Sequence, residues 1–126
     1  LLDLLLAHDG VDLEAEVCGG VTYDEVHHNP DAALTKIVER FAAVQDRCDT
    51  VVIIGSDYSD VTAPAEFSFN ARVAANLGAG VLLLVSAKNR TPDQVARVAA
   101  AAVVRLIVAT QEKQAAKERF IYDTNE

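Results

Sequence analysis

Two short runs of apolar residues, Val51–Ile54 and Val81–Val85, are the most prominent feature of the hydrophobic pattern along the chain. Both runs are rich in branched residues, lack polar alternation and are too short for a typical helix. This is the pattern of parallel strands buried on both faces. Between them lie a polar loop and a helix predicted over Pro64–Leu77, which ends at Gly78. Strand, loop, helix and strand form a βαβ unit, because parallel strands require a connection of about this length.

The residues before this unit are predicted to contain two helices separated by an irregular stretch. Leu1–His8 is interpreted as the last part of a helix, Val11–Glu16 as a connector, and Val17–Tyr23 as a short strand or irregular crossing. A longer helix is predicted over Pro30–Asp46, where apolar residues recur every three or four positions, as in a helix packed on a sheet. Its apolar stripe comprises Leu34, Ile37, Val38, Phe41 and Val44, and its solvent-facing residues are Lys36, Glu39, Arg40 and Gln45.

A further helix is predicted after the second apolar run. Thr91 can cap this helix and Gln94 can complete a capping box. No Pro or Gly interrupts the Ala/Val-rich segment that follows, so the helix can extend as far as Phe120. Alternatively, Leu106–Ala109 forms a short strand and Gln111–Arg119 a separate polar helix, and propensity alone does not decide between the two.

The carboxyl ends of the two predicted strands are the expected place for a site, because open α/β sheets bind ligands there. Polar and charged residues follow both ends, and Glu66 and Asn70, four residues apart, share one face of the connecting helix. The candidate ligand-binding residues are Ser56, Asp57, Tyr58, Asp60, Glu66, Asn70 and Lys88. No catalytic or metal-binding residue is predicted.

Several of these candidates also have a structural interpretation. Asp57 and Asp60 can cap the loop or begin a turn, and the sequence favours this role. Asn70 can bond a backbone carbonyl of the loop and hold its shape, which is again the favoured interpretation. Lys88 can attract an anion or simply lie exposed in its loop.

The histidine pair His27-His28 invites a metal or acid–base interpretation. Asn29 is a good helix cap, Pro30 suits the first helical position, and Asp31 suits the positive end of the helix dipole. Adjacent histidines do not share a helical face, and no third ligand follows at metal-site spacing. We therefore favour a structural role for this stretch.

Composition and charge narrow the class of protein. The chain has 126 residues, which allows one domain, and a net charge of −8 with scattered basic residues, which argues against nucleic acid and anionic membranes as partners. No apolar run reaches the ~20 residues that cross a bilayer, and the first ten residues lack the features of a signal peptide. Cys18 and Cys48 form no metal-binding pattern, so we expect reduced thiols in a cytoplasmic protein.

The string GSDYSDVTAPAEFSFNARVAANLGAGVLLLVSAKNRTPDQVA, which occupies Gly55–Ala96, resembles the amino-terminal domain of bacterial phosphate acetyltransferase in its long actinobacterial form. Upstream, Gly20–His27, Pro30–Ala33 and Cys48-Asp49 look like the same domain in the same order. The resemblance covers about residues 1–98, and residues 99–126 diverge from it.

The resemblance implies a P-loop-type, dethiobiotin synthetase-like domain, that is, a three-layer α/β/α sandwich with a mainly parallel sheet. In the family this domain precedes the acyltransferase domain and is linked to regulation and oligomerisation. The implied partners are the acyltransferase domain of the same parent chain, further copies of the chain, and a small-molecule effector. The implied parent reaction interconverts acetyl-CoA plus phosphate with acetyl phosphate plus CoA.

The phosphate-binding loop of such folds requires GxxxxGK[ST], because backbone amides cradle phosphate and the Lys reaches the outer phosphates. None of the six glycines is followed by Lys, and in the family's order this loop would lie before Leu1. The chain contains no Met. We therefore expect residues 1–126 to be a single partial domain, without the first strand and P-loop, without a cofactor and inactive alone.

Two alternatives stay open. An ATP-dependent ligase fragment of the dethiobiotin synthetase type requires a GK[ST] loop upstream. A receiver-like signalling module would use Asp57 as phosphoacceptor and Lys88 after a later strand, but its acidic pair after the first strand is not visible. Hydrolase motifs such as GxSxG and HExxH are absent from the sequence.

Overall fold

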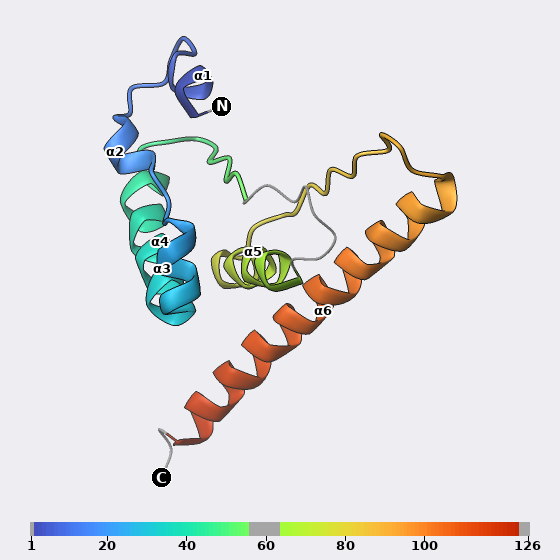
Figure 1. Cartoon of the computed structure of the whole chain (residues 1–126). Coiled ribbons are helices and arrows are strands. Elements are labelled where there is room, and N and C mark those ends of the chain that lie inside the picture. Colours follow the sequence, from blue (N-terminus) through green and yellow to red (C-terminus); the bar gives the residue numbers. More distant parts are fainter. Residues whose placement is uncertain (1, 56–63, 124–126) are drawn as a thin grey trace. The chain divides into compact units, whose positions relative to one another are not determined.

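A computed structural model of the chain describes residues 2–55 and 64–123 (Figure 1). Over these ranges the regular elements are helices, and no strand is found among them. The helices are α1 (Leu2–Leu6), α2 (Ala15–Cys18), α3 (Tyr23–His28), α4 (Pro30–Gln45), α5 (Pro64–Leu77) and α6 (Pro92–Asp123). The chain divides into two compact units, Leu1–Ile53 and Ile54–Glu126. The predicted single partial domain stays a prediction.

In the first unit, local side-chain caps set where α3 and α4 begin. The Thr22 hydroxyl accepts the backbone N–H of Glu25 at 3.3 Å, and the Glu25 carboxylate accepts the backbone N–H of Thr22 at 2.8 Å. This reciprocal pair is a capping box for α3. Asn29 caps α4 by accepting the N–H of Ala32 at 3.0 Å, with Pro30 in the first turn. The predicted start of this helix is confirmed.

Charged side chains of α4 reach the preceding segments. Lys36 Nζ donates to the Glu25 carboxylate at 2.5 Å, and Arg40 donates to the backbone carbonyls of Gly19 and Gly20. The sequence predicts that Lys36 and Arg40 face solvent. Both side chains are half-exposed, and their charged ends also reach acceptors that are remote in sequence. The predictions of a connector over Val11–Glu16 and of a strand or irregular crossing over Val17–Tyr23 are wrong where the two meet. The helix α2, Ala15–Cys18, spans the boundary between them.

In the second unit, α5 has the predicted bounds and ends in the predicted glycine. Gly78 has a φ of 65°, which a residue without a Cβ adopts at low cost. The N–H of Ala79 donates to the Ala74 carbonyl at 3.0 Å, which closes the helix by a six-to-one hydrogen bond. Lys113 Nζ of α6 donates to the carbonyls of Ala75 at 2.5 Å and Asn76 at 3.1 Å. These contacts satisfy the last carbonyls of α5.

α6 is one continuous helix of 32 residues that packs against α5 (Figure 1). Its start carries the predicted capping box, in which Thr91 and Gln94 exchange hydrogen bonds of 2.8 and 3.3 Å. The alternative with a strand at Leu106–Ala109 is wrong, because the Ala/Val-rich segment contains no helix breaker. The buried side chains of the pair are Phe69, Ala71, Val73, Ala102 and Ala109. Arg105 adds a hydrogen bond of 3.0 Å to the Ser68 hydroxyl.

The two apolar runs that the sequence predicts as buried strands lie in non-helical chain without ladder partners in the described part of the molecule. Val52 is 72% exposed, and Leu82 and Leu84 are 86% and 84% exposed. The burial predicted for these runs is therefore not found in this structure. Parallel strands depend on hydrogen-bonded neighbour strands, and in the described part of the chain these runs have none. The mainly parallel sheet stays a prediction.

Candidate functional site

The structure describes only part of the predicted ligand-binding set. Ser56, Asp57, Tyr58 and Asp60 lie outside the described residues. Glu66 lies in α5, but its side chain is also outside the described part. Asn70 in α5 and Lys88 in the turn before α6 are described, so the site can be built from these two positions.

Asn70 lies beside the end of the first apolar run. Its side chain is half-buried in the second turn of α5. A Cβ added at Gly55 would lie 3.0 Å from Asn70 Nδ2 and 3.1 Å from its Cγ. The carboxamide therefore packs directly on the Gly55 backbone. The hydrogen bond from Asn70 to a loop carbonyl and its ligand-binding role both stay predictions.

Lys88 is exposed in a turn that is shaped by its own neighbours. Its backbone N–H donates to the Ser86 hydroxyl at 3.3 Å, and Arg90 Nη1 donates to the Ser86 carbonyl at 2.7 Å. Asn89 adopts a φ of 58°, a left-handed conformation that Asn tolerates in turns. The contacts of Lys88 and Asn70 described above involve no other member of the predicted set.

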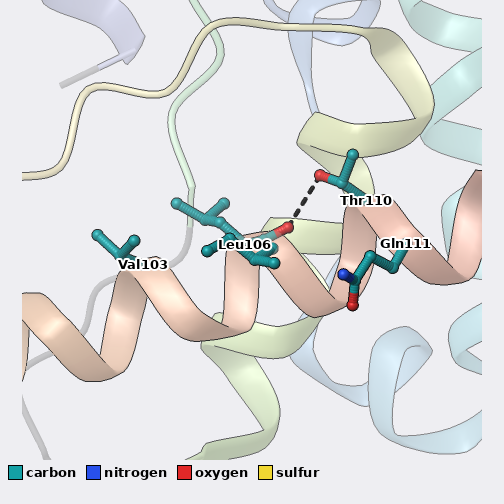
Figure 2. Close-up of a pocket in the computed structure, with 5 residues that line it drawn as sticks. Val103, Leu106, Thr110 and Gln111 are labelled. Carbon is teal, nitrogen blue, oxygen red and sulfur yellow. Dashed lines mark hydrogen bonds between the residues drawn. The ribbon is translucent and has the colours of Figure 1, made fainter.

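An open hollow of about 300 Å³ lies along α6 (Figure 2). It is lined by Val103, Leu106, Ile107, Thr110 and Gln111. The Thr110 hydroxyl donates to the Leu106 carbonyl at 2.9 Å, so it is engaged within the helix. The lining contains no titratable side chain, and it offers apolar contact instead of acid–base chemistry. The hollow was not predicted from the sequence, although apolar residues on several faces of residues 98–109 indicate an apolar surface there.

A carboxylate with a lowered pKa lies in the first unit, among the described residues. The Lys36 ammonium and then the Thr22 N–H lower the pKa of the Glu25 carboxyl to about 2. Both partners stabilise the charged carboxylate. Glu25 is thereby committed to holding α3 and α4 together. Among the described residues, no group of three His, Cys, Asp or Glu side chains is arranged to hold a metal ion.

Comparison with known proteins identifies the family. The profile of a family described as "AAA domain" matches residues 11–124. This chain belongs to that AAA domain family. The match takes in most of residues 99–126, the segment that the sequence predicts to diverge from phosphate acetyltransferase. The family is P-loop-like and favours an α/β NTPase fold, although no strand occurs in residues 2–55 and 64–123.

A more specific similarity is to a phosphate acetyltransferase of Nitratidesulfovibrio vulgaris. It is 29% identical to this AAA-family chain over an alignment of 94 residues, and the match covers 71% of this chain and 13% of the relative. The chain thus spans about an eighth of that relative's length. No solved structure matches the chain. The two matches support the resemblance to an amino-terminal phosphate acetyltransferase-like domain.

One further observation concerns membranes. In the described part of the chain, none of the helices combines the length and the apolar content that crossing a bilayer requires.

Proposed function

We propose that this chain is a non-catalytic regulatory and oligomerisation domain of a phosphate acetyltransferase. The observation that carries the proposal is the family match over residues 11–124 combined with 29% identity to a phosphate acetyltransferase. Because the matched stretch is 13% of that enzyme, we assign acyl transfer to the part of the enzyme that this chain does not cover.

The side chains of this chain support a non-catalytic role. A nucleotide-binding P-loop requires a Gly-Lys pair to hold phosphates, and none of the six glycines precedes a Lys. The hollow on α6 is lined without a titratable group. The carboxylate with the lowered pKa, Glu25, is engaged with Lys36 and Thr22. The charged Glu25 carboxylate therefore stabilises the contact between α3 and α4, and we assign it no role in proton transfer.

We further propose that the partners of this domain are the acyltransferase domain of the same parent chain and additional copies of the chain. A small-molecule effector would bind at the carboxyl ends of the apolar runs, where the predicted ligand-binding residues follow in sequence. Regulation through such a site requires no group transfer by this chain.

The proposed fold in the parent protein is a three-layer α/β/α sandwich, with Val51–Ile54 and Val81–Val85 as parallel strands. The exposed Leu82 and Leu84 side chains support this, because burying apolar area is worth about 25 cal/mol per Å². Hydrogen exchange tests the proposal. The amides of both runs should be protected in the parent protein and exchange rapidly in the isolated chain. Rapid exchange in both proteins would contradict the sheet.

Enzyme assays test the proposed role directly. The purified 126-residue chain, given acetyl-CoA and phosphate, should form no acetyl phosphate, whereas the N. vulgaris enzyme forms it under the same conditions. A chimaera of that enzyme, with this chain in place of the matched segment, should retain acyl transfer and form the oligomer of the parent. Acetyl phosphate formation by the chain alone would refute the non-catalytic role.

A second candidate is a fragment of an ATP-dependent ligase, favoured by the P-loop-like family match. It requires a GK[ST] sequence outside these 126 residues. Titration of ATP and Mg²⁺ into the parent protein distinguishes the candidates. Tight nucleotide binding that is lost when the Lys of such a sequence is changed to Ala would favour the ligase.

A further inference from the structure

Gly55 lies at a position where any larger residue would meet the side chain of Asn70. A Cβ built at Gly55 would be 3.0 Å from Asn70 Nδ2, 3.1 Å from Cγ and 3.3 Å from Oδ1. Carbon atoms in favourable contact are separated by about 3.5–4.0 Å. The Asn70 carboxamide therefore occupies the space that a side chain at position 55 would need.

The backbone at Gly55 does not itself require glycine. Among the described glycines, only Gly10 and Gly78 have positive φ angles. An alanine at position 55 would therefore face no backbone strain of this kind. Glycine is needed at position 55 because the Asn70 side chain approaches the backbone closely, and not because the backbone turns there with a positive φ.

Asn70 has little freedom to move away from Gly55, because the residues on either side of it in α5 are buried and the helix is bonded to α6. Its neighbours in α5, Phe69 and Ala71, are buried at 7% and 1% exposure. The helix is also tied to α6 by the hydrogen bond of 3.0 Å between Arg105 and the Ser68 hydroxyl. A displacement of Asn70 by the few tenths of an ångström that a Cβ at position 55 requires would disturb these contacts.

We propose that Gly55 and Asn70 form a clasp that holds the backbone at Gly55 against α5. Residues 56–63 connect Gly55 to Pro64, the first residue of the same helix. The clasp thus brings both ends of this connection to α5 and offsets part of the entropy cost of closing it. In this arrangement the Asn70 carboxamide packs on the backbone at Gly55 and does not bind a ligand. The clasp is independent of the proposed acetyltransferase role.

A double-mutant cycle in the full chain tests the clasp. Gly55→Ala should lower the midpoint of thermal unfolding, followed by helical circular dichroism, by about 5 °C because it overpacks the contact. Gly80→Ala is the matched control, since Gly80 has no positive φ and no atom within 4 Å of its Cβ position. It should leave the midpoint nearly unchanged. In an Asn70→Ala background, Gly55→Ala should behave like the control.

The outcomes are decisive in either direction. An unchanged midpoint for Gly55→Ala, or an equal loss in both backgrounds, would overturn the clasp. A second measurement needs no variant: nuclear Overhauser contacts should join the Gly55 α-protons to the Asn70 carboxamide protons. Their absence in the folded chain would also overturn the proposal, even if Gly55→Ala fails to fold.

Discussion

The two compact units hold their helices together by different means. In the unit before Ile54, α4 is tied to earlier segments by the charged groups of Lys36 and Arg40. In the other unit, α5 and α6 bury apolar side chains such as Phe69 and Ala102. Helix length explains the difference. α2 and α3 have 4 and 6 residues and offer little apolar face, whereas α5 and α6 have 14 and 32. α4 itself has 16 residues and buries Ala33 and Val44, so it is its short partner helices, with little apolar face, that depend on charged contacts and caps.

The largest effect is expected where burial dominates. Phe69→Ala removes a side chain that is 7% exposed in the contact between α5 and α6. Deleting a buried aromatic ring typically costs about 3–5 kcal/mol. Urea unfolding followed by helical circular dichroism should show this loss or an unfolded chain. If the variant matches the parent chain, burial does not hold this pair together.

A matched control uses an apolar residue in the same unit. Leu84 is 84% exposed, so Leu84→Ala should change the free energy of unfolding by no more than about 0.5 kcal/mol. A loss comparable to that of Phe69→Ala would mean that Leu84 is buried in solution. That result would support a packed sheet in the isolated chain.

The second prediction concerns the charged contacts of the other unit. Arg40→Ala removes the donor to the Gly19 and Gly20 carbonyls. We expect a loss of about 1–2 kcal/mol, because hydrogen bonds from charged groups are stronger than neutral ones. Arg97→Ala removes an exposed arginine of α6 and should have little effect. Equal urea midpoints for the two variants would contradict the role assigned to Arg40.

Helix ends could be predicted from the sequence because their chemistry is local. Asn29, Thr91 and Gly78 each act on residues within one turn, and the structure confirms each of them. The contact of Arg40 with Gly19 was missed because it joins residues 21 apart, and sequence spacing does not report such reach.

The site could be predicted from the sequence only in part for the same reason. Strand pairing depends on residues that are remote in sequence. The apolar pattern of Val81–Val85 indicates that this run favours a β-strand, but it does not indicate which strand it would pair with. The sequence also offered two roles for Asn70, ligand contact and support of the loop. The contact with Gly55 depends on the fold and could not be predicted from the sequence, and both roles stay predictions.

A smaller effect on stability is expected for the charged contact between α6 and the end of α5. Lys113 donates to the Ala75 and Asn76 carbonyls at the end of α5. A cation at this end of a helix typically contributes about 0.3–1 kcal/mol. Lys113→Ala should therefore lower stability by this amount, and Lys117→Ala, an exposed lysine on the same helix, should not. Indistinguishable thermal midpoints for the two variants would show that the Lys113 contacts do not stabilise the end of α5.

The smallest and most specific effect concerns acid. The pKa of Glu25 falls from 4.5 to about 2 because Lys36 and the Thr22 N–H favour the carboxylate. A carboxyl whose pKa is lower in the folded state stabilises the fold above its unfolded pKa, and this contribution is lost as pH falls from about 4.5 to about 2. Thermal midpoints of the chain and of Glu25→Gln, compared from pH 6 to pH 2, should therefore converge at the acidic end. The change should be confined to the unit with the ionic contacts, so probes on α3 should follow it and probes on α5 should not. Parallel pH profiles for the two proteins would show that the Lys36 contact contributes nothing to folding.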